Sequence, residues 1–131
     1  MDRIVEVDFA GGLKVNARMG AAVIPTDQPV ESGGEGTAPS PLSLFLASLA
    51  TCAGYYALQF CLSRYIATEG LACRAVFSYN ETERRYTRVR IDLTLPQGFP
   101  DNYRNAIIKA VDSCAVRKHL VNPPSFEVTA G

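Results

Sequence analysis

The periodicity of hydrophobic and polar positions changes several times along the chain, and each change marks a predicted element. Residues 4–9, 13–17 and 21–24 alternate, wholly or in part, between apolar and polar positions, with glycines between the segments. Alternation with a period of two is typical of strands that bury one face, and glycine pairs favour tight turns. We therefore predict a group of three strands near the start of the chain.

The segment at residues 40–63 is a long stretch without a charged residue. Leucine, phenylalanine and tyrosine recur there in every direction around a period of 3.6 residues, which predicts a helix that is apolar all round. Ser40 and Pro41 suit the N-cap and the first turn of this helix. We expect the helix to end near Thr68, with Gly70 as its C-terminal stop.

A helix that is apolar all round is either a membrane span or the buried centre of a fold. The stretch is about as long as a bilayer requires, roughly 20 residues. Its flanks, however, lack the Lys/Arg clusters and tryptophans that are typical of a membrane interface. We therefore favour a buried central helix. Small or polar residues also dilute its apolar character: Ser43, Ser48, Thr51, Gly54 and Gln59.

The second half of the chain returns to strands and then to helices. Residues 73–79 and 86–95 alternate between apolar and polar positions on either side of a charged turn. Helical spacing follows at residues 101–113, a short helix or turn at residues 113–120, and a short apolar strand at residues 126–128. We predict an α+β fold with two groups of antiparallel strands around the long helix.

Length and charge narrow the classes of function. A chain of 131 residues suits one domain, residues 1–131. The 13 basic and 13 acidic residues cancel, and no basic patch indicates a nucleic-acid partner. The first residues resemble neither a signal nor a transit peptide, so we expect a cytoplasmic protein with reduced thiols. A chain of this length has few residues left to cover a helix that is apolar all round, so we expect a homodimer, in which a second copy covers it.

Four cysteines, at positions 52, 61, 73 and 114, are the main candidates for chemistry. The chain has no CxxC pair and a single histidine, which argues against a zinc site. Cys52 and Cys61 lie about 180° apart around the helix and roughly 13.5 Å apart along it. That separation exceeds the Cα distance of a disulfide, about 4.4–6.8 Å. Cys73 alternates with core positions of its strand and is expected to fill the core.

Cys52 and Cys114 admit two interpretations. Cys114 opens a segment containing Arg117, Lys118 and His119, and both a helix N-terminus and nearby cations lower a thiol pKa. Cys52 lies within an apolar helix and would be inert unless it were paired across the core. The two thiols could meet in the fold and cycle between dithiol and disulfide, or both could fill the core. We expect His119 to be a surface residue rather than a catalytic base.

The chain resembles the OsmC/Ohr family of peroxide-reducing proteins in three segments: Gly33–Gly36, Ala38–Cys52 and Cys114–Val116. The order of strands, glycine loop, cysteine helix, strands, helix and second cysteine matches over nearly the whole chain. The second motif departs from the usual Cys-Pro-Val-Ser at Ala115 and Arg117. The resemblance implies an OsmC-like fold, with two antiparallel sheets around long central helices in an intertwined homodimer.

The resemblance also implies a chemistry. Cys52 would be the thiolate that attacks an organic hydroperoxide, and its sulfenic acid would condense with Cys114 to form a disulfide. An external thiol or lipoyl reductant would then restore the dithiol. No cofactor, metal, nucleic-acid or membrane partner is expected.

One departure from the family's usual residues, at the start of the long helix, bears on the expected peroxidase activity. The peroxidase branches of the family often begin the helix with Asn-Pro-Glu, and the glutamate pairs with an arginine beside the reactive thiol. This chain has Ser40-Pro41-Leu42 instead, so the glutamate is absent. Arg18 is the only residue suggested for the arginine, and Glu31 or Glu35 could substitute for the glutamate. The alternative is a catalytically weak protein of the same fold that binds a hydrophobic small molecule or senses redox state. Such a pocket would be lined by Leu44, Phe45 and Leu49.

Overall fold

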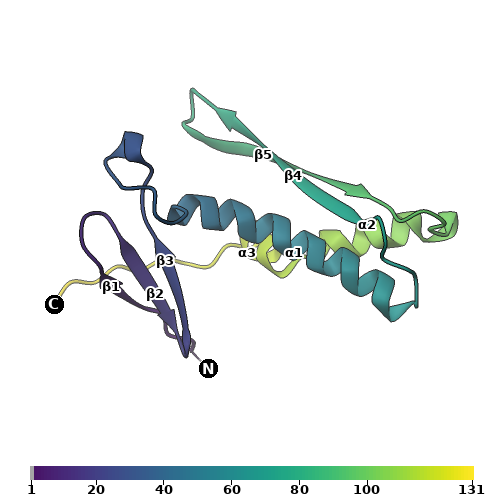
Figure 1. Ribbon diagram of the computed structural model, residues 1–131, viewed down its shortest axis with the longest axis horizontal. Coiled ribbons are helices and arrows are strands. Elements are labelled where there is room, and N and C mark those ends of the chain that lie inside the picture. Colours follow the sequence, from purple (N-terminus) through teal and green to yellow (C-terminus); the bar gives the residue numbers. More distant parts are fainter. Residues whose placement is uncertain (1) are drawn as a thin grey trace. The chain divides into compact units, whose positions relative to one another are not determined.

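The computed structural model describes residues 2–131, which divide along the sequence into two compact units, the first ending at Leu46 and the second beginning at Ala47. The first unit contains a three-stranded antiparallel sheet in the order β1-β2-β3 (Figure 1). Its strands are β1 (Glu6–Phe9), β2 (Val15–Met19) and β3 (Ala22–Thr26), which confirms the three predicted strands.

The register of this sheet separates apolar from polar side chains. Val7 pairs with Ala17, and Ala17 pairs with Ile24, so these three side chains share one face. The neighbouring set, Asp8 and Asn16, lies on the opposite face. Val7 is 56% exposed, so the first unit leaves part of an apolar sheet face uncovered.

The glycine-containing loop after β3 is held by one buried carboxylate. Asp27 is 1% exposed and accepts hydrogen bonds from the backbone N–H groups of Gln28 (2.7 Å), Glu35 (3.3 Å) and Thr37 (3.1 Å). The Thr37 hydroxyl donates a further bond at 2.8 Å. A Cβ atom at Gly34 would lie 2.0 Å from the carbonyl oxygen of Gln28, so only glycine fits there.

These bonds make the loop a defined structure, which also contains the short helix η1 (Val30–Ser32). Hydrogen bonds from the Thr37 backbone and hydroxyl, with smaller contributions from Gln28 and Glu35, lower the pKa of Asp27 to about 2.

Helix α1 (Pro41–Ser63) starts as the sequence predicts. The Ser40 hydroxyl oxygen accepts a hydrogen bond from the N–H of Ser43 at 3.1 Å, and the Ser40 carbonyl accepts one from Leu44 at 3.0 Å. Ser40 is therefore the N-cap, and Pro41 occupies the first helical position, where its missing N–H costs nothing.

The end of α1 differs from the prediction. The helix stops at Ser63, and Tyr65 adopts the left-handed conformation at φ 55°. The N–H of Ile66 bonds to the carbonyl of Cys61 at 2.9 Å, and that of Tyr65 bonds to the carbonyl of Leu62 at 3.3 Å. This pair of bonds is a Schellman motif.

The expected end near Thr68 with Gly70 as the stop is therefore wrong. Ile66 packs against the core, and that contact turns the chain before Gly70 is reached. Gly70 instead has a φ of 85° in the turn that leads into the next strand.

The second unit contains a two-stranded hairpin and the remaining helices. The hairpin pairs β4 (Ala72–Asn80) with β5 (Arg85–Thr94) in antiparallel register, as predicted (Figure 1). The short helix η2 (Asp101–Tyr103) leads into α2 (Arg104–Asp112), and α3 (Ala115–Val121) follows one turn later. The described residues form three α-helices and two small antiparallel sheets, which confirms the α+β class.

The predicted strand at residues 126–128 is wrong. Residues 123–131 contain neither helix nor strand in the structure. A strand forms only against a partner, and neither of the chain's two sheets includes this segment. Phe126 and Val128 are consequently 89% and 94% exposed.

The core of the second unit lies between α1, α2 and β5. Side chains of α1 and α2 form its buried centre, and the apolar face of β5 covers them. The buried members are Ala53, Ala57, Phe60, Cys61, Ile107 and Val111.

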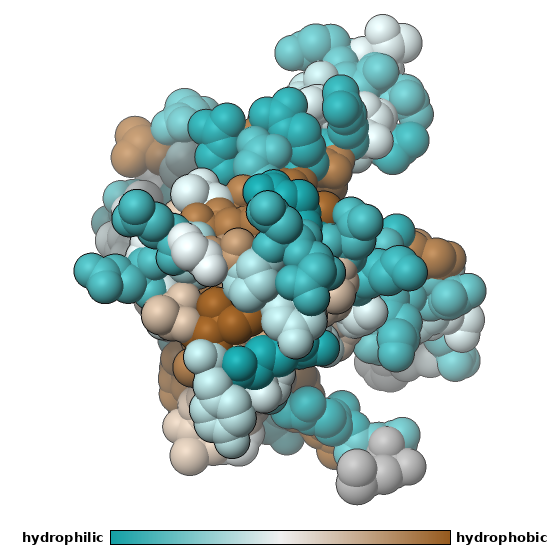
Figure 2. Space-filling view, turned by 90° about the vertical axis from the view of Figure 1, so that its right-hand side faces the viewer, coloured by the Kyte–Doolittle hydropathy of each residue, from teal (hydrophilic) through white to brown (hydrophobic). Residues whose placement is uncertain are grey.

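Helix α1 buries only one of its faces within the chain. Tyr55, Leu58 and Leu62 follow an i, i+3, i+7 spacing on the opposite face and are 58%, 40% and 55% exposed. Figure 2 shows apolar surface between polar patches on one side of the molecule. By length and composition, α1 is long and apolar enough to cross a membrane, but the core helix of a soluble protein meets the same criterion.

Candidate functional site

Two of the predicted site residues, Cys52 and Cys114, are in contact. Cys52 lies in the middle of α1, and Cys114 is the residue that caps the start of α3. The N–H of Cys114 bonds to the carbonyl of Val111 at 3.2 Å, which fixes the turn between α2 and α3. The Cys114 thiol donates a hydrogen bond to the Cys52 sulfur.

The start of α3 supplies further donors to Cys52. The first N–H groups of a helix have no partner within the helix, so they are free to bond to a nearby acceptor. Those of Val116 and Ala115 point at the Cys52 sulfur. Burial raises the pKa of Cys52, but hydrogen bonds from the Cys114 thiol and these two N–H groups outweigh it, and the net pKa lies below the ordinary thiol value.

Cys114 has the opposite electrostatic character. It is 4% exposed, and burial together with its hydrogen bond to Cys52 raises its pKa, although the N–H groups of Arg117 and Val116 oppose the shift. The prediction that the helix start and nearby cations would activate Cys114 is therefore wrong. Donors of α3 stabilise negative charge on Cys52, so deprotonation is favoured at Cys52 and disfavoured at Cys114.

The other two cysteines belong to the core. Cys61 is fully buried, and burial raises its pKa despite the opposing charge of Arg64. Burial and the negative charge of Asp92 raise the pKa of Cys73. All four cysteines are free thiols, and the two core thiols lack the donors that lower the pKa of Cys52.

Of the charged residues suggested from the sequence, Arg18 and Glu35 have partners within the first unit, and Glu31 lies exposed in η1. Arg18 pairs with Asp8 at 2.6 Å, and Glu35 pairs with Lys14. Leu42 is 54% exposed and has no polar side-chain atom. Within the second unit, the groups that lower the pKa of Cys52 are hydrogen-bond donors, and no cation is among them.

His119 is exposed on α3, as expected, and its Nδ1 lies 2.7 Å from the carbonyl oxygen of Ala115. That contact engages one ring nitrogen with the helix backbone.

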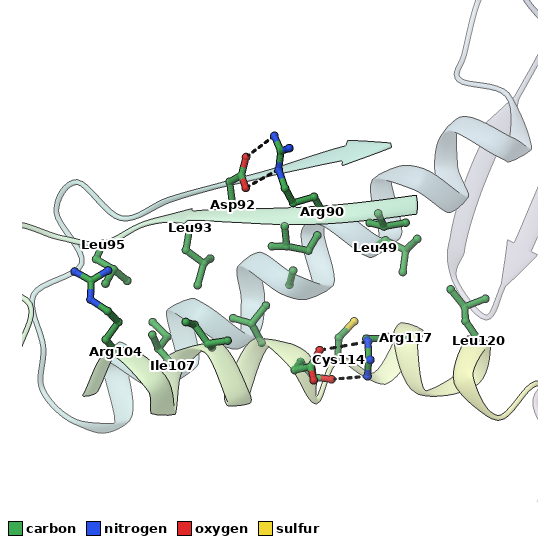
Figure 3. A pocket seen from close by; sticks show the side chains of 16 residues that line it. Leu49, Arg90, Asp92, Leu93, Leu95, Arg104, Ile107, Cys114, Arg117 and Leu120 are labelled. Carbon is green, nitrogen blue, oxygen red and sulfur yellow. Dashed lines mark hydrogen bonds and ion pairs between the residues drawn. The ribbon is translucent and has the colours of Figure 1, made fainter. Parts of the chain in front are cut away.

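A groove of about 680 Å³ lies beside Cys114, a volume in the usual range for small-molecule sites. Figure 3 shows β5 along one side and α2 and α3 along the other, with Cys114 in the wall. Of the apolar residues expected to line a pocket, Leu49 lines this groove, whereas Leu44 and Phe45 do not. Sequence reasoning missed the groove, although the alternating apolar face of β5 and the apolar stripe of α2 indicated its walls.

Comparison with protein families gives one match. Residues 34–129 match the family described as OsmC-like protein, and this range includes both Cys52 and Cys114. A comparison with curated protein sequences gave no match.

Several solved structures share the fold. A Psychrobacter arcticus protein, described as an osmotic stress induced and detoxification response protein, is 27% identical with a TM-score of 0.72, over 87% of this chain and 85% of that one. An OsmC-like protein from Mycoplasma pneumoniae is 16% identical with a TM-score of 0.71, over 94% and 89%. An organic hydroperoxide resistance protein OsmC from Legionella pneumophila is 21% identical with a TM-score of 0.60, over 92% and 89%. The chain belongs to the OsmC-like protein family.

Proposed function

We propose that this protein reduces organic hydroperoxides through a cycle between the dithiol and the disulfide of Cys52 and Cys114. The observation that carries the proposal is the contact between these two thiols, in which Cys114 and the start of α3 donate hydrogen bonds to Cys52. A thiolate is the nucleophilic form of cysteine, so a thiol with a lowered pKa beside a second thiol suits this chemistry.

In the first step, the Cys52 thiolate attacks the distal oxygen of the hydroperoxide. An S–O bond forms as the O–O bond breaks, the alkoxide takes up a proton, and the products are an alcohol and a sulfenic acid on Cys52. Sulfur loses the two electrons that the peroxide gains. The donors of α3 stabilise the thiolate before attack, a role that the family assigns to an arginine.

In the second step, the Cys114 sulfur attacks the sulfenic sulfur, a disulfide forms, and the oxygen leaves as water. The raised pKa of Cys114 keeps it protonated until Cys52 has reacted, so the two thiols do not compete for the peroxide. An external thiol or lipoyl dithiol then reduces the disulfide by thiol–disulfide exchange and is itself oxidised. A cycle that begins from reduced thiols suits a cytoplasmic location.

We propose further that the working form is a homodimer. The stripe of Tyr55, Leu58 and Leu62 on α1 and the apolar face of the first sheet are uncovered in one chain. Burial of such surface stabilises association by about 25 cal/mol per Å² of apolar area before the costs of association are subtracted. A second copy of the chain would supply matching apolar surfaces.

A second candidate function is binding without turnover. The groove beside Cys114 has the volume of a small-molecule site, and Leu42 replaces the glutamate that the family's peroxidases carry. Such a protein would bind an apolar ligand and consume no peroxide.

Steady-state peroxide consumption with a dithiol reductant separates the two functions. We expect Cys52→Ser to abolish consumption, and Cys114→Ser to stop it after one oxidation per site. Cys73→Ser, which alters a core thiol away from the pair, is the matched control and should retain turnover. Wild-type turnover in Cys52→Ser contradicts the proposed peroxidase function.

A further inference from the structure

A second depression, of about 330 Å³, lies between the C-terminal half of α1 and α2. It shares no lining residue with the groove beside Cys114. The stripe of Tyr55, Leu58 and Leu62 that is proposed for assembly does not line it either. The depression therefore has no part in the peroxidase cycle or in the dimer proposed above.

The polar side chains that line this depression can all donate hydrogen bonds. They are Tyr56, Gln59, Ser63, Arg64, Lys109 and Ser113. Among the described residues of its wall, Arg64 and Lys109 are cations and none carries a carboxylate. Neither cation forms an ion pair with another residue in the range 2–131. The depression thus combines two positive charges with further donors and contains no negative charge to balance them.

The guanidinium group of Arg64 is already held in place. Its central carbon lies 3.7 Å from the ring centroid of Phe60 and 5.6 Å from that of Tyr103. Its Nη1 donates hydrogen bonds to the Phe60 carbonyl oxygen at 3.4 Å and to the Ser63 hydroxyl at 3.1 Å. The Nε and Nη2 donors remain available. A side chain that is fixed before a ligand arrives loses little conformational entropy when the ligand binds.

Lys109 lies in the last turn of α2, where the end of a helix stabilises a positive charge. That role accounts for a cation at this position but does not occupy its three N–H donors. Lys109 and Arg64 therefore approach one depression from two different helices, each with donors to spare.

We propose that this depression binds a phosphate group, either as the free ion or as the end of a small phosphomonoester, between Arg64 and Lys109. A phosphate group carries a charge of about −1.5 to −2 at pH 7 and three strong acceptor oxygens, so it can engage both cations at once. Arginine offers it a planar set of donors, and lysine a compact charge. The volume is at the lower end of the range for small-molecule sites, which suits a small anion.

Two-dimensional ¹H–¹⁵N NMR of the reduced full-length protein tests this inference, with sodium phosphate as the probe and sodium chloride keeping the ionic strength constant. We expect saturable shifts of the Arg64 Nε signal and of the amide signals of residues 106–113. Sodium acetate, a singly charged carboxylate, should cause no saturable shift. Arg64→Gln and Lys109→Gln should each weaken phosphate binding about tenfold, since a charge-assisted hydrogen bond contributes about that factor. Arg64→Lys should keep part of the affinity.

The matched controls are Arg88→Gln and Lys118→Gln, which remove the same charges at exposed positions outside the depression and should leave the affinity unchanged. A second titration, with glycerol 3-phosphate, separates the two sources of the phosphate group. Tighter binding than inorganic phosphate assigns the site to a monoester, and weaker binding assigns it to the free ion. No saturable shift with phosphate, an equal response to acetate, or an unchanged affinity in either glutamine variant overturns the inference.

Discussion

The thiol of Cys114 donates a hydrogen bond to the sulfur of Cys52, joining the middle of α1 to the start of α3. The direction of this bond gives the two cysteines different chemical characters. Cys52 accepts hydrogen bonds that lower its pKa, whereas Cys114 donates one and is buried, which raises its pKa. An attacking thiolate and a resolving thiol need this asymmetry.

The first prediction concerns the pH dependence of Cys52 alkylation. Because donors lower the pKa of Cys52, its rate of reaction with iodoacetamide should rise with pH and reach its plateau at a lower pH than for an ordinary thiol. Cys114→Ala removes one donor, so the pKa of Cys52 should rise and alkylation at neutral pH should slow. Peptide mapping by mass spectrometry gives the rate at Cys52 alone.

The control for that experiment is Cys73→Ala, which leaves the pair intact and should keep the wild-type profile. An identical pH profile in wild type and Cys114→Ala contradicts the role assigned to the Cys114 donor.

The second prediction concerns the buried carboxylate of Asp27. Asp27→Ala removes the acceptor of four hydrogen bonds within the loop, so the variant should unfold at a clearly lower urea concentration. The pKa of Asp27 is lowered in the folded state, so its contribution is present above the unfolded value of 3.8 and is lost as pH falls towards about 2.

The stability difference between wild type and Asp27→Asn should therefore shrink as pH falls through this range. Asp101→Asn, at an exposed aspartate of η2, should change stability little at any pH. A difference that is constant with pH means that the charge of Asp27 does not hold the loop.

The third prediction concerns the end of α1. Tyr65 is 98% exposed and adopts a φ of 55°, a conformation that glycine reaches without steric cost. Tyr65→Gly should raise the free energy of unfolding by roughly 0.5–1 kcal/mol. Tyr65→Ala removes the same ring but keeps the strain, so it should give no such gain. Urea denaturation measures both, and destabilisation by glycine contradicts the Schellman assignment.

The fourth prediction concerns assembly. Leu58→Glu places a charge in the exposed apolar stripe of α1 and should convert a dimer into a monomer, which analytical ultracentrifugation resolves. Gln59→Glu adds the same charge one residue along, outside the stripe, and should remain dimeric. A monomeric wild-type protein at micromolar concentration contradicts the proposed homodimer.

Local sequence signals predicted much of the fold. The N-cap at Ser40 and the alternation of β5 depend on neighbouring residues, and both are found in the structure. The end of α1 was mispredicted because the left-handed turn falls on Tyr65, a residue that rarely adopts it. The strand at residues 126–128 was mispredicted because a strand requires a partner, which local alternation does not reveal.

The candidate site, too, could be predicted from the sequence only in part. Family resemblance selected Cys52 and Cys114, but the thiol with the lowered pKa could not be chosen from spacing. Cys114 is closer in sequence to the cations and the helix start, yet the free N–H groups of α3 point at Cys52 across the core.

Single-turnover oxidation of the reduced protein by tert-butyl hydroperoxide tests the central claim most directly. Intact mass and peptide mapping, read within seconds of mixing, report which sulfurs have reacted. The proposed cycle predicts the rapid loss of two hydrogens, mapped to a disulfide between Cys52 and Cys114. No reaction over minutes with excess peroxide, or oxidation confined to Cys61 or Cys73, would contradict it.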